Sequence, residues 1–285
     1  MPRLFALAVI LLQSAASSGA LITVGCVGDS ITEGVGASCP PCPQPHPLQA
    51  CGLAGCLHSW PGQLELLLGN GTSHSVLNWG HVAATMLSTT NCPSAHVDPT
   101  CGGRNCSNGK PCRSNGPPYW VTSEFARATN ATAPLDAVII MLGTNDAKLN
   151  NWKYLGNVTQ YAADALRMVQ TFLALPSRPQ VFLSTPPPLY RATYSMNQTV
   201  VGVVIPRLLR AIAQRTGAHF IDMITPLGRW PELSDPQLFL PNATNGGCDD
   251  VKPGACKGDG CHPDDLGHRK IAEVVQRALA AAGVA

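Results

Sequence analysis

Charged side chains are scarce in this sequence, and no strong charge run interrupts it. Asp, Glu, Lys and Arg make up 13% of the 285 residues, and the formal net charge is +2. The longest basic run is the Arg269-Lys270 pair. The sequence therefore has no basic segment of the kind that binds nucleic acid or an anionic membrane surface, and we expect neither as a partner.

The sequence also lacks an apolar run long enough to cross a bilayer, so we expect no stable membrane insertion. Arg3, the apolar run at residues 4–12 and the small residues at 14–20 predict a secretory signal peptide over residues 1–19. A buried first strand or helix is the alternative. The remaining domain, residues 20–285, is then expected outside the cell or in the lumen of the secretory pathway, with a lysosome-like compartment as one destination.

Metal-ligand spacings are missing too. The pair Cys39 and Cys42 is not matched by a second Cys-x-x-Cys, so we expect no metal, and no motif calls for a cofactor. Cys26 lies in an apolar run, which predicts a free, buried thiol. The other cysteines fall in Pro-, Gly- and Asn-rich stretches, where disulfides would fasten loop insertions at about 38–59 and 91–118. These loop cysteines are Cys39, Cys42, Cys51, Cys56, Cys92, Cys101, Cys106, Cys112, Cys248, Cys256 and Cys261.

Asn-x-Ser/Thr sequons add to the secretory pattern, since they are the acceptors of N-linked glycans. Together with the signal peptide and the loop cysteines they predict a glycoprotein. The six sequons begin at Asn70, Asn105, Asn130, Asn157, Asn197 and Asn242.

Short apolar runs alternate with helical patterns along the chain. Consecutive Val, Ile and Leu residues predict strands buried on both faces, and alternation with helices predicts an α/β fold with a parallel sheet covered on both sides. The predicted strands are 21–27, 75–77, 137–142, 180–183 and 218–221. Helices are predicted near 158–172, near 201–212 with Pro206 in the first turn, and after Pro263 with Leu266, Ile271 and Leu279 facing inward.

Ser30 follows the first predicted strand directly, in Gly28-Asp29-Ser30, and is therefore expected at the carboxyl edge of the sheet. A serine there is either a nucleophile or a simple helix N-cap. A serine hydroxyl needs a base, and the base needs a carboxylate to orient it. Asp259 and His262, three residues apart before the last helix, supply both from one loop, whereas His268 lies within the helix and suits a packing or solvated role.

A third polar segment, Gly143-Thr144-Asn145-Asp146, ends another predicted strand. The Asn145 amide can donate to the oxyanion of a tetrahedral intermediate, although Asn-Asp is also ordinary turn chemistry.

The three segments, in this order and at these strand ends, resemble the SGNH (GDSL-type) hydrolase family. The resemblance implies a flavodoxin-like three-layer sandwich and a catalytic triad of Ser30, His262 and Asp259. It also implies an oxyanion hole made by the backbone N–H of Ser30, the Asn145 amide and the backbone N–H of a loop glycine. Ala83 occupies the position of that glycine here, and Gly80 is the second candidate.

Aromatic segments around Tyr119-Trp120, Trp152 and Tyr190 look like a branch of this family associated with carbohydrate O-acetylesterases of the sialate and xylan type. These aromatics would either stack on sugars or anchor the core. The expected function is a secreted serine esterase that removes O-acetyl groups from glycans through an acyl-enzyme. The alternatives are a lysophospholipase or lipase, and a non-catalytic glycan-binding protein, for which the substitution at Ala83 is the one argument.

Overall fold

The computed structural model describes residues 21–38, 56–69, 71–89, 116–152, 158–190, 192–228 and 260–285. The predicted signal peptide, Asp259 and most of the two insertions lie outside these ranges. Of the loop cysteines only Cys56 and Cys261 lie within them, so the predicted disulfide framework stays a prediction. Within the described ranges, no helix is long and apolar enough to cross a bilayer.

A five-stranded, entirely parallel sheet forms the centre of the molecule. Its strands run in the order β2-β1-β3-β4-β5, which is the flavodoxin-like order. Each of the five strands predicted from the sequence is confirmed, with bounds that differ by a few residues. The strands are β1 (Ile22–Gly28), β2 (His74–Gly80), β3 (Ala137–Met141), β4 (Gln180–Ser184) and β5 (His219–Ile221).

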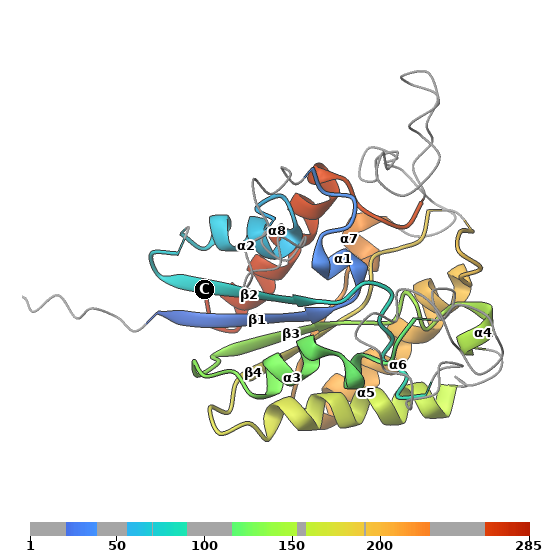
Figure 1. Ribbon diagram of the computed structural model, residues 1–285, viewed down its shortest axis with the longest axis horizontal. Helices are drawn as coiled ribbons and strands as arrows, with labels where there is room; N and C mark the ends of the chain where they lie inside the picture. The colour runs from blue at the N-terminus through green and yellow to red at the C-terminus, as the bar shows by residue number, and fades with distance from the viewer. Residues whose placement is uncertain are drawn as a thin grey trace, which may run out of the picture.

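Helices cover both faces of this sheet (Figure 1). Helices α2 (Trp60–Leu67) and α8 (Asp265–Ala281) pack on one face, and α3 (Ser123–Thr129), α5 (Val158–Leu173) and α6 (Ile205–Thr216) pack on the other. Side chains of β3 alternate between the two cores, with Ile139 in one and Ile140 in the other. The predicted α/β architecture is therefore confirmed. Shorter elements complete the described chain: α1 (Ser30–Glu33), η4 (Tyr119–Val121), α4 (Leu149–Trp152), the π-helix η5 (Val200–Val204) and α7 (Ile224–Leu227).

Most buried positions follow the predicted pattern, with one exception in α8. Ile271 and Leu279 are buried as predicted, but Leu266 is exposed. Leu266 precedes Ile271 by five residues, which at 3.6 residues per turn places it well off the buried face of the helix. Cys26 is free and fully buried, as predicted.

The register of the sheet brings the polar segments to one place. Gly28, the last residue of β1, pairs with Gly80 of β2 on one side and with Met141 of β3 on the other. The segments that follow these three strand ends therefore leave the sheet side by side. The chain order also reverses at β1, and this switch point is where doubly wound sheets bind ligands.

Candidate active site at the carboxyl edge of the sheet

Ser30 is the first residue of α1, and the turn that presents it depends on its two predecessors. A Cβ on Gly28 would lie 2.0 Å from Thr32 Oγ1 and 2.8 Å from the Met141 carbonyl oxygen, so only glycine fits this tight strand-to-helix turn. Asp29 is the N-cap of α1, and its Oδ1 accepts from the Ile31 N–H at 3.0 Å. Because Asp29 caps the helix, the Ser30 hydroxyl is left for another partner.

That partner is His262. Ser30 Oγ lies 3.0 Å from His262 Nε2, across 232 positions of sequence, and both residues are almost fully buried. The distance is that of a nucleophile and its general base. The structure thus brings together two of the three predicted triad residues, and the third, Asp259, lies outside the described residues.

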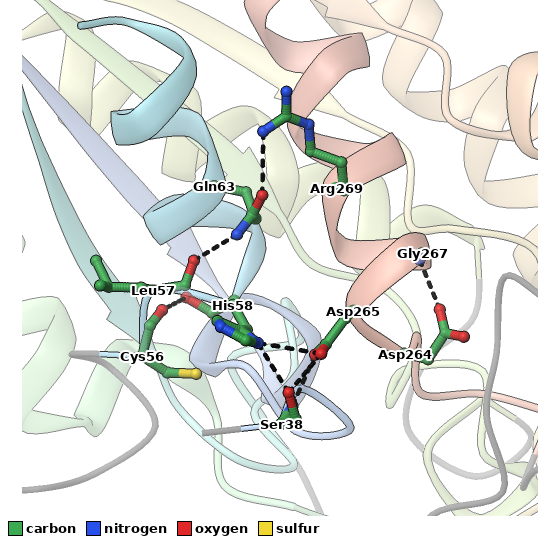
Figure 2. Close-up of polar contacts among 10 residues, drawn as sticks. Ser38, Cys56, Leu57, His58, Gln63, Asp264, Asp265, Gly267 and Arg269 are labelled. Atoms are coloured by element: carbon green, nitrogen blue, oxygen red, sulfur yellow. Dashed lines mark hydrogen bonds and ion pairs between the residues drawn. The ribbon is translucent and has the colours of Figure 1, made fainter. Parts of the chain in front are cut away.

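His262 is placed by the start of α8, which several hydrogen bonds tie to the rest of the molecule (Figure 2). Asp264 caps the helix by accepting from the Gly267 N–H at 2.7 Å. The next residue, Asp265, accepts from the Ser38 backbone N–H at 2.7 Å and from the Ser38 hydroxyl, and it contacts His58 Nδ1 at 3.0 Å. Ser38 and His58 stand at the two ends of the first predicted insertion, so Asp265 fastens both ends beside the histidine segment.

Ser38, His58 and Asp265 are the residue types of a triad, but their geometry differs from one. A single nitrogen, His58 Nδ1, lies near both the Ser38 hydroxyl, at 2.8 Å, and the Asp265 carboxylate, at 3.0 Å. A catalytic imidazole takes the proton on one ring nitrogen and is oriented through the other. The cluster therefore acts as an exposed structural contact.

Asn145 lies beside Ser30, as the strand register requires. Its amide nitrogen donates to the Ala84 carbonyl oxygen at 3.2 Å and lies 3.5 Å from Asp29 Oδ2. The Asn145 amide thus lies between Asp29, which precedes Ser30, and Ala84, which follows Ala83. Within the described part of the chain, neither the Ser30 nor the Ala83 backbone N–H has a protein acceptor. The Ser30 and Ala83 N–H groups and the Asn145 amide are therefore candidate donors to an oxyanion.

The two candidates for the loop donor differ in what their N–H groups do. The Gly80 N–H donates to Asn78 Oδ1 at 2.9 Å and is therefore engaged. Ala83 has a φ of 62°, in the left-handed region that glycine occupies without penalty. Alanine thus adopts the backbone conformation expected of a glycine, at a cost of roughly 1–2 kcal/mol. Position 83 therefore has both a backbone N–H and a left-handed φ, although its residue is alanine and not glycine.

Asp146 holds the loop that contains Ala83 through two hydrogen bonds. Its carboxylate is fully buried and accepts from the Met86 N–H at 2.9 Å and from the Leu87 N–H at 2.8 Å. Asn145 and Asp146 together therefore hold the segment that begins at Ala83. Sequence reasoning assigned no role to Asp146, because an Asp after Asn at a strand end is also common in turns.

Two buried carboxylates create the electrostatics of the site. Burial raises the pKa of Asp29 to about 6, and hydrogen bonding to the Ile31 N–H and the charge of His262 oppose that rise. Burial likewise raises the pKa of Asp146 to about 7, against the opposing hydrogen bonds from Met86 and Leu87. Lys148 is also buried, which lowers its pKa, while the charges of Asp29 and Asp146 favour its protonated form. Its cation partly offsets the two carboxylates.

The predicted aromatic segments turn out to be anchors. Tyr119 is fully buried, and its hydroxyl donates to the Trp79 carbonyl oxygen at 2.7 Å. Trp120 Nε1 donates to the Met86 carbonyl oxygen at 2.7 Å, and the rings of Trp152 and Tyr161 pack 5.8 Å apart. The Tyr190 hydroxyl donates to the Leu227 carbonyl oxygen. These contacts favour the interpretation that the aromatic residues anchor the core over the alternative that they stack on sugars.

His268 is a packing residue, as expected. It is fully buried, its Nδ1 accepts from the Trp60 N–H at 3.1 Å, and burial lowers its pKa to about 4. A histidine held neutral between two backbone groups has no access to a substrate.

The protein has an α/β fold with a parallel sheet, and a serine and a histidine are in contact at the carboxyl edge of that sheet. This combination is typical of serine hydrolases. Residues 26–270 match the GDSL-like Lipase/Acylhydrolase family, and the chain belongs to this family of carboxylic ester hydrolases. The resemblance drawn from the three sequence segments is confirmed at this level.

Individual relatives are distant. The chain is 24% identical over 272 residues to an acetylxylan esterase of Xylanibacter ruminicola; the match covers 90% of the chain but 43% of that longer protein. Among solved structures, a carbohydrate acetylesterase family member from Sinorhizobium meliloti superposes with a TM-score of 0.54 at 20% identity, covering 91% of this chain and 97% of that one. An aryl esterase of M. smegmatis gives a TM-score of 0.57 at 18% identity, covering 91% and 99%. These similarities support the fold.

Proposed function

We propose that this protein is a serine esterase that hydrolyses carboxylic esters through an acyl-enzyme on Ser30. The observation that carries the proposal is the 3.0 Å contact between Ser30 Oγ and His262 Nε2. Ser30 attacks the ester carbonyl, and His262 takes the hydroxyl proton and returns it to the departing alcohol. Asp259, three residues before His262, is proposed to orient the imidazole. Water then releases the acid by the same route.

The negative charge that develops on the carbonyl oxygen meets the N–H groups of Ser30 and Ala83 and the Asn145 amide. Asn145 is held against Ala84, and Asp146 holds the loop, so these donors need no reorganisation when the charge forms. Alanine at position 83 keeps the backbone N–H and adopts a left-handed φ, which supports a catalytic role over the alternative of a non-catalytic glycan-binding protein.

The proposed substrate is an O-acetyl group on a glycan. Similarity to an acetylxylan esterase and to a carbohydrate acetylesterase family member favours this substrate over a lipid ester. The proposed setting is extracellular or the secretory lumen, on the evidence of the leader-like residues 1–19, the loop cysteines and the sequons. Mass mapping of protein secreted from a eukaryotic host should find residues 1–19 removed, loop cysteines oxidised and sequons occupied.

A serine-directed fluorophosphonate probe tests the nucleophile. The wild-type protein should take up one label, Ser30→Ala should take up none, and both Ser30→Ala and His262→Ala should lose 10³-fold or more in p-nitrophenyl acetate hydrolysis. Ser38→Ala is the matched control. Ser38 also contacts a histidine and an aspartate, but both the serine and the aspartate lie near the same ring nitrogen, His58 Nδ1, so this variant should be labelled and should hydrolyse the ester like the wild type. Labelling of Ser30→Ala to the wild-type level would disprove the assignment.

A further inference from the structure

A strained turn lies next to the catalytic histidine. It comprises Thr193–Met196, in the segment between β4 and η5, and is closed by a hydrogen bond from the Met196 N–H to the Thr193 carbonyl oxygen at 2.8 Å. Its two central residues, Tyr194 and Ser195, have φ values of 48° and 58°. Positive φ at both central positions is the pattern of a type I′ turn, which Gly, Asn and Asp normally occupy. Neither tyrosine nor serine is suited to this conformation.

The surrounding chain holds the turn in this unfavourable conformation. The Leu149 N–H donates to the Ser195 carbonyl oxygen at 2.9 Å, and the Asn197 N–H donates to the Ala147 carbonyl oxygen at 2.9 Å. Lys148 and Met196 form an antiparallel bridge between these two bonds. The turn is therefore fastened to the segment that continues directly from Asn145 and Asp146. Strain that the surroundings enforce in this way is concentrated at functional sites.

The turn presents the Tyr194 ring at the edge of His262. The ring centroids lie 6.0 Å apart at an interplanar angle of 65°, and Tyr194 is 45% exposed. Tyr119 and Tyr161, by comparison, are fully buried. A large aromatic ring that both contacts the catalytic imidazole and remains open to solvent is positioned to meet a substrate.

The chemistry of His262 decides which part of the substrate that is. During acylation a bond forms between Ser30 Oγ and the acyl carbon, the bond from that carbon to the alcohol oxygen breaks, and the proton held on His262 Nε2 passes to the alcohol oxygen. The leaving alcohol must therefore lie within hydrogen-bond reach of His262. The oxyanion donors, by contrast, come from Ser30, Ala83 and Asn145. Tyr194 therefore borders the alcohol and not the acyl group.

We infer that Tyr194 is a specificity-determining residue that stacks on the sugar ring carrying the scissile acetyl group. The inference rests on the proposed function. An aromatic ring offers a flat apolar face with a polar hydroxyl at its rim, which matches the C–H face and the hydroxyl groups of a pyranose. The strained turn fixes this face before the substrate arrives, so that binding does not require the ring to be ordered.

The test compares alcohols that share one acyl group. Acetylated methyl xylopyranoside, phenyl acetate and ethyl acetate all give the same acetyl-enzyme, so differences in kcat/KM report only binding of the alcohol and acylation. Tyr194→Asn removes the ring and retains a residue that tolerates positive φ, and Tyr194→Phe keeps the ring. We expect the sugar-to-ethyl ratio of kcat/KM to fall about five- to ten-fold in Tyr194→Asn and to stay within two-fold in Tyr194→Phe.

Leu66→Asn, on the far helix α2, removes an exposed apolar side chain away from the site and should leave the sugar-to-ethyl ratio unchanged. Equal losses on all three esters in Tyr194→Asn would mean that the ring acts by positioning His262, and would overturn the inference. A loss on phenyl acetate without one on the sugar ester would overturn the choice of a sugar. Failure of the wild-type protein to hydrolyse any of the three would instead count against the proposed function.

Discussion

The Asn145 amide nitrogen donates to the Ala84 carbonyl oxygen at 3.2 Å, and this bond joins two parts of the proposed oxyanion hole. Asn145 follows β3, and Ala84 follows β2, the two strands that flank β1 and the proposed nucleophile Ser30. One amide hydrogen is therefore engaged in holding the amide plane. The weak contact at 3.5 Å to Asp29 leaves the other hydrogen ready for a substrate oxygen.

Replacing Asn145 by alanine should therefore lower kcat by roughly 10²–10³, about 3–4 kcal/mol, with little change in KM. The reason is that the lost donor meets a charge that exists mainly in the transition state. Steady-state kinetics with p-nitrophenyl acetate measure both constants, and thermal unfolding checks that the fold persists. If Asn145→Ala retained kcat within a few-fold of the wild type, the Gly143–Asp146 segment would be only a turn that ends β3, with no role in catalysis.

Ala83 offers a test of the backbone donor. Ala83→Gly should keep kcat/KM within a few-fold, because alanine already adopts the left-handed φ and glycine supplies the same N–H. Ala83→Pro should abolish activity, since proline has no N–H and its φ is fixed near −65°. Arg178→Gly is the matched control: Arg178 is exposed and has a φ of 49°, so this change relieves similar backbone strain away from the site. A large gain in activity in Ala83→Gly would show that alanine impairs the loop.

Acyl-chain length separates the acetylesterase from the lipid alternative. Asp29, Ser30 and Asn145 are all buried, so a long acyl chain would have to displace packed groups around the nucleophile. We expect p-nitrophenyl acetate to be hydrolysed at least ten-fold faster than the octanoate, compared as kcat/KM. Equal or higher rates on the octanoate would favour a lipase or lysophospholipase.

The sequence predicted what depends on periodicity and on strand ends. Consecutive apolar residues identified β3, and the position of Ser30 directly after β1 predicted that it lies at the carboxyl edge of the sheet, where it contacts His262. Local backbone conformation was harder to predict, because Tyr194-Ser195 contains none of the residues that normally indicate positive φ. The repeat of apolar residues near 201–212 did not reveal the π-helix η5, because η5 spans only Val200–Val204, about one turn, which is too short for its period to show in the sequence. Asp146 was missed because its two acceptor bonds depend on a loop some sixty residues earlier.

Asp146 gives a prediction for the pH dependence of stability. Its pKa rises from 3.8 to about 7 on folding because of burial, so the folded state favours the protonated form. The stabilisation is complete below the unfolded pKa, near 3.9, and is lost as the pH rises through about 7. For the wild type, this group should lower the free energy of unfolding by about 2–3 kcal/mol between pH 5 and pH 8, out of a total of about 4 kcal/mol that is lost between pH 3 and pH 8.

Asp146→Asn cannot titrate and should lack this part of the pH slope. Its amide oxygen accepts only one of the two N–H groups of Met86 and Leu87, so the variant should be less stable than the wild type at pH 5. The difference should narrow by pH 8, where the wild type must hold an ionised, buried carboxylate. Urea unfolding at both pH values measures the free energy of unfolding of the two proteins. The same change with pH in both would contradict the raised pKa of Asp146.

Asp146→Asn should also lower kcat, because the loop that Asp146 holds is displaced. Asp136→Asn is the matched control at the opposite edge of the sheet, where one carboxylate oxygen accepts from the Thr23 N–H and an amide oxygen can replace it, and it should leave kcat unchanged.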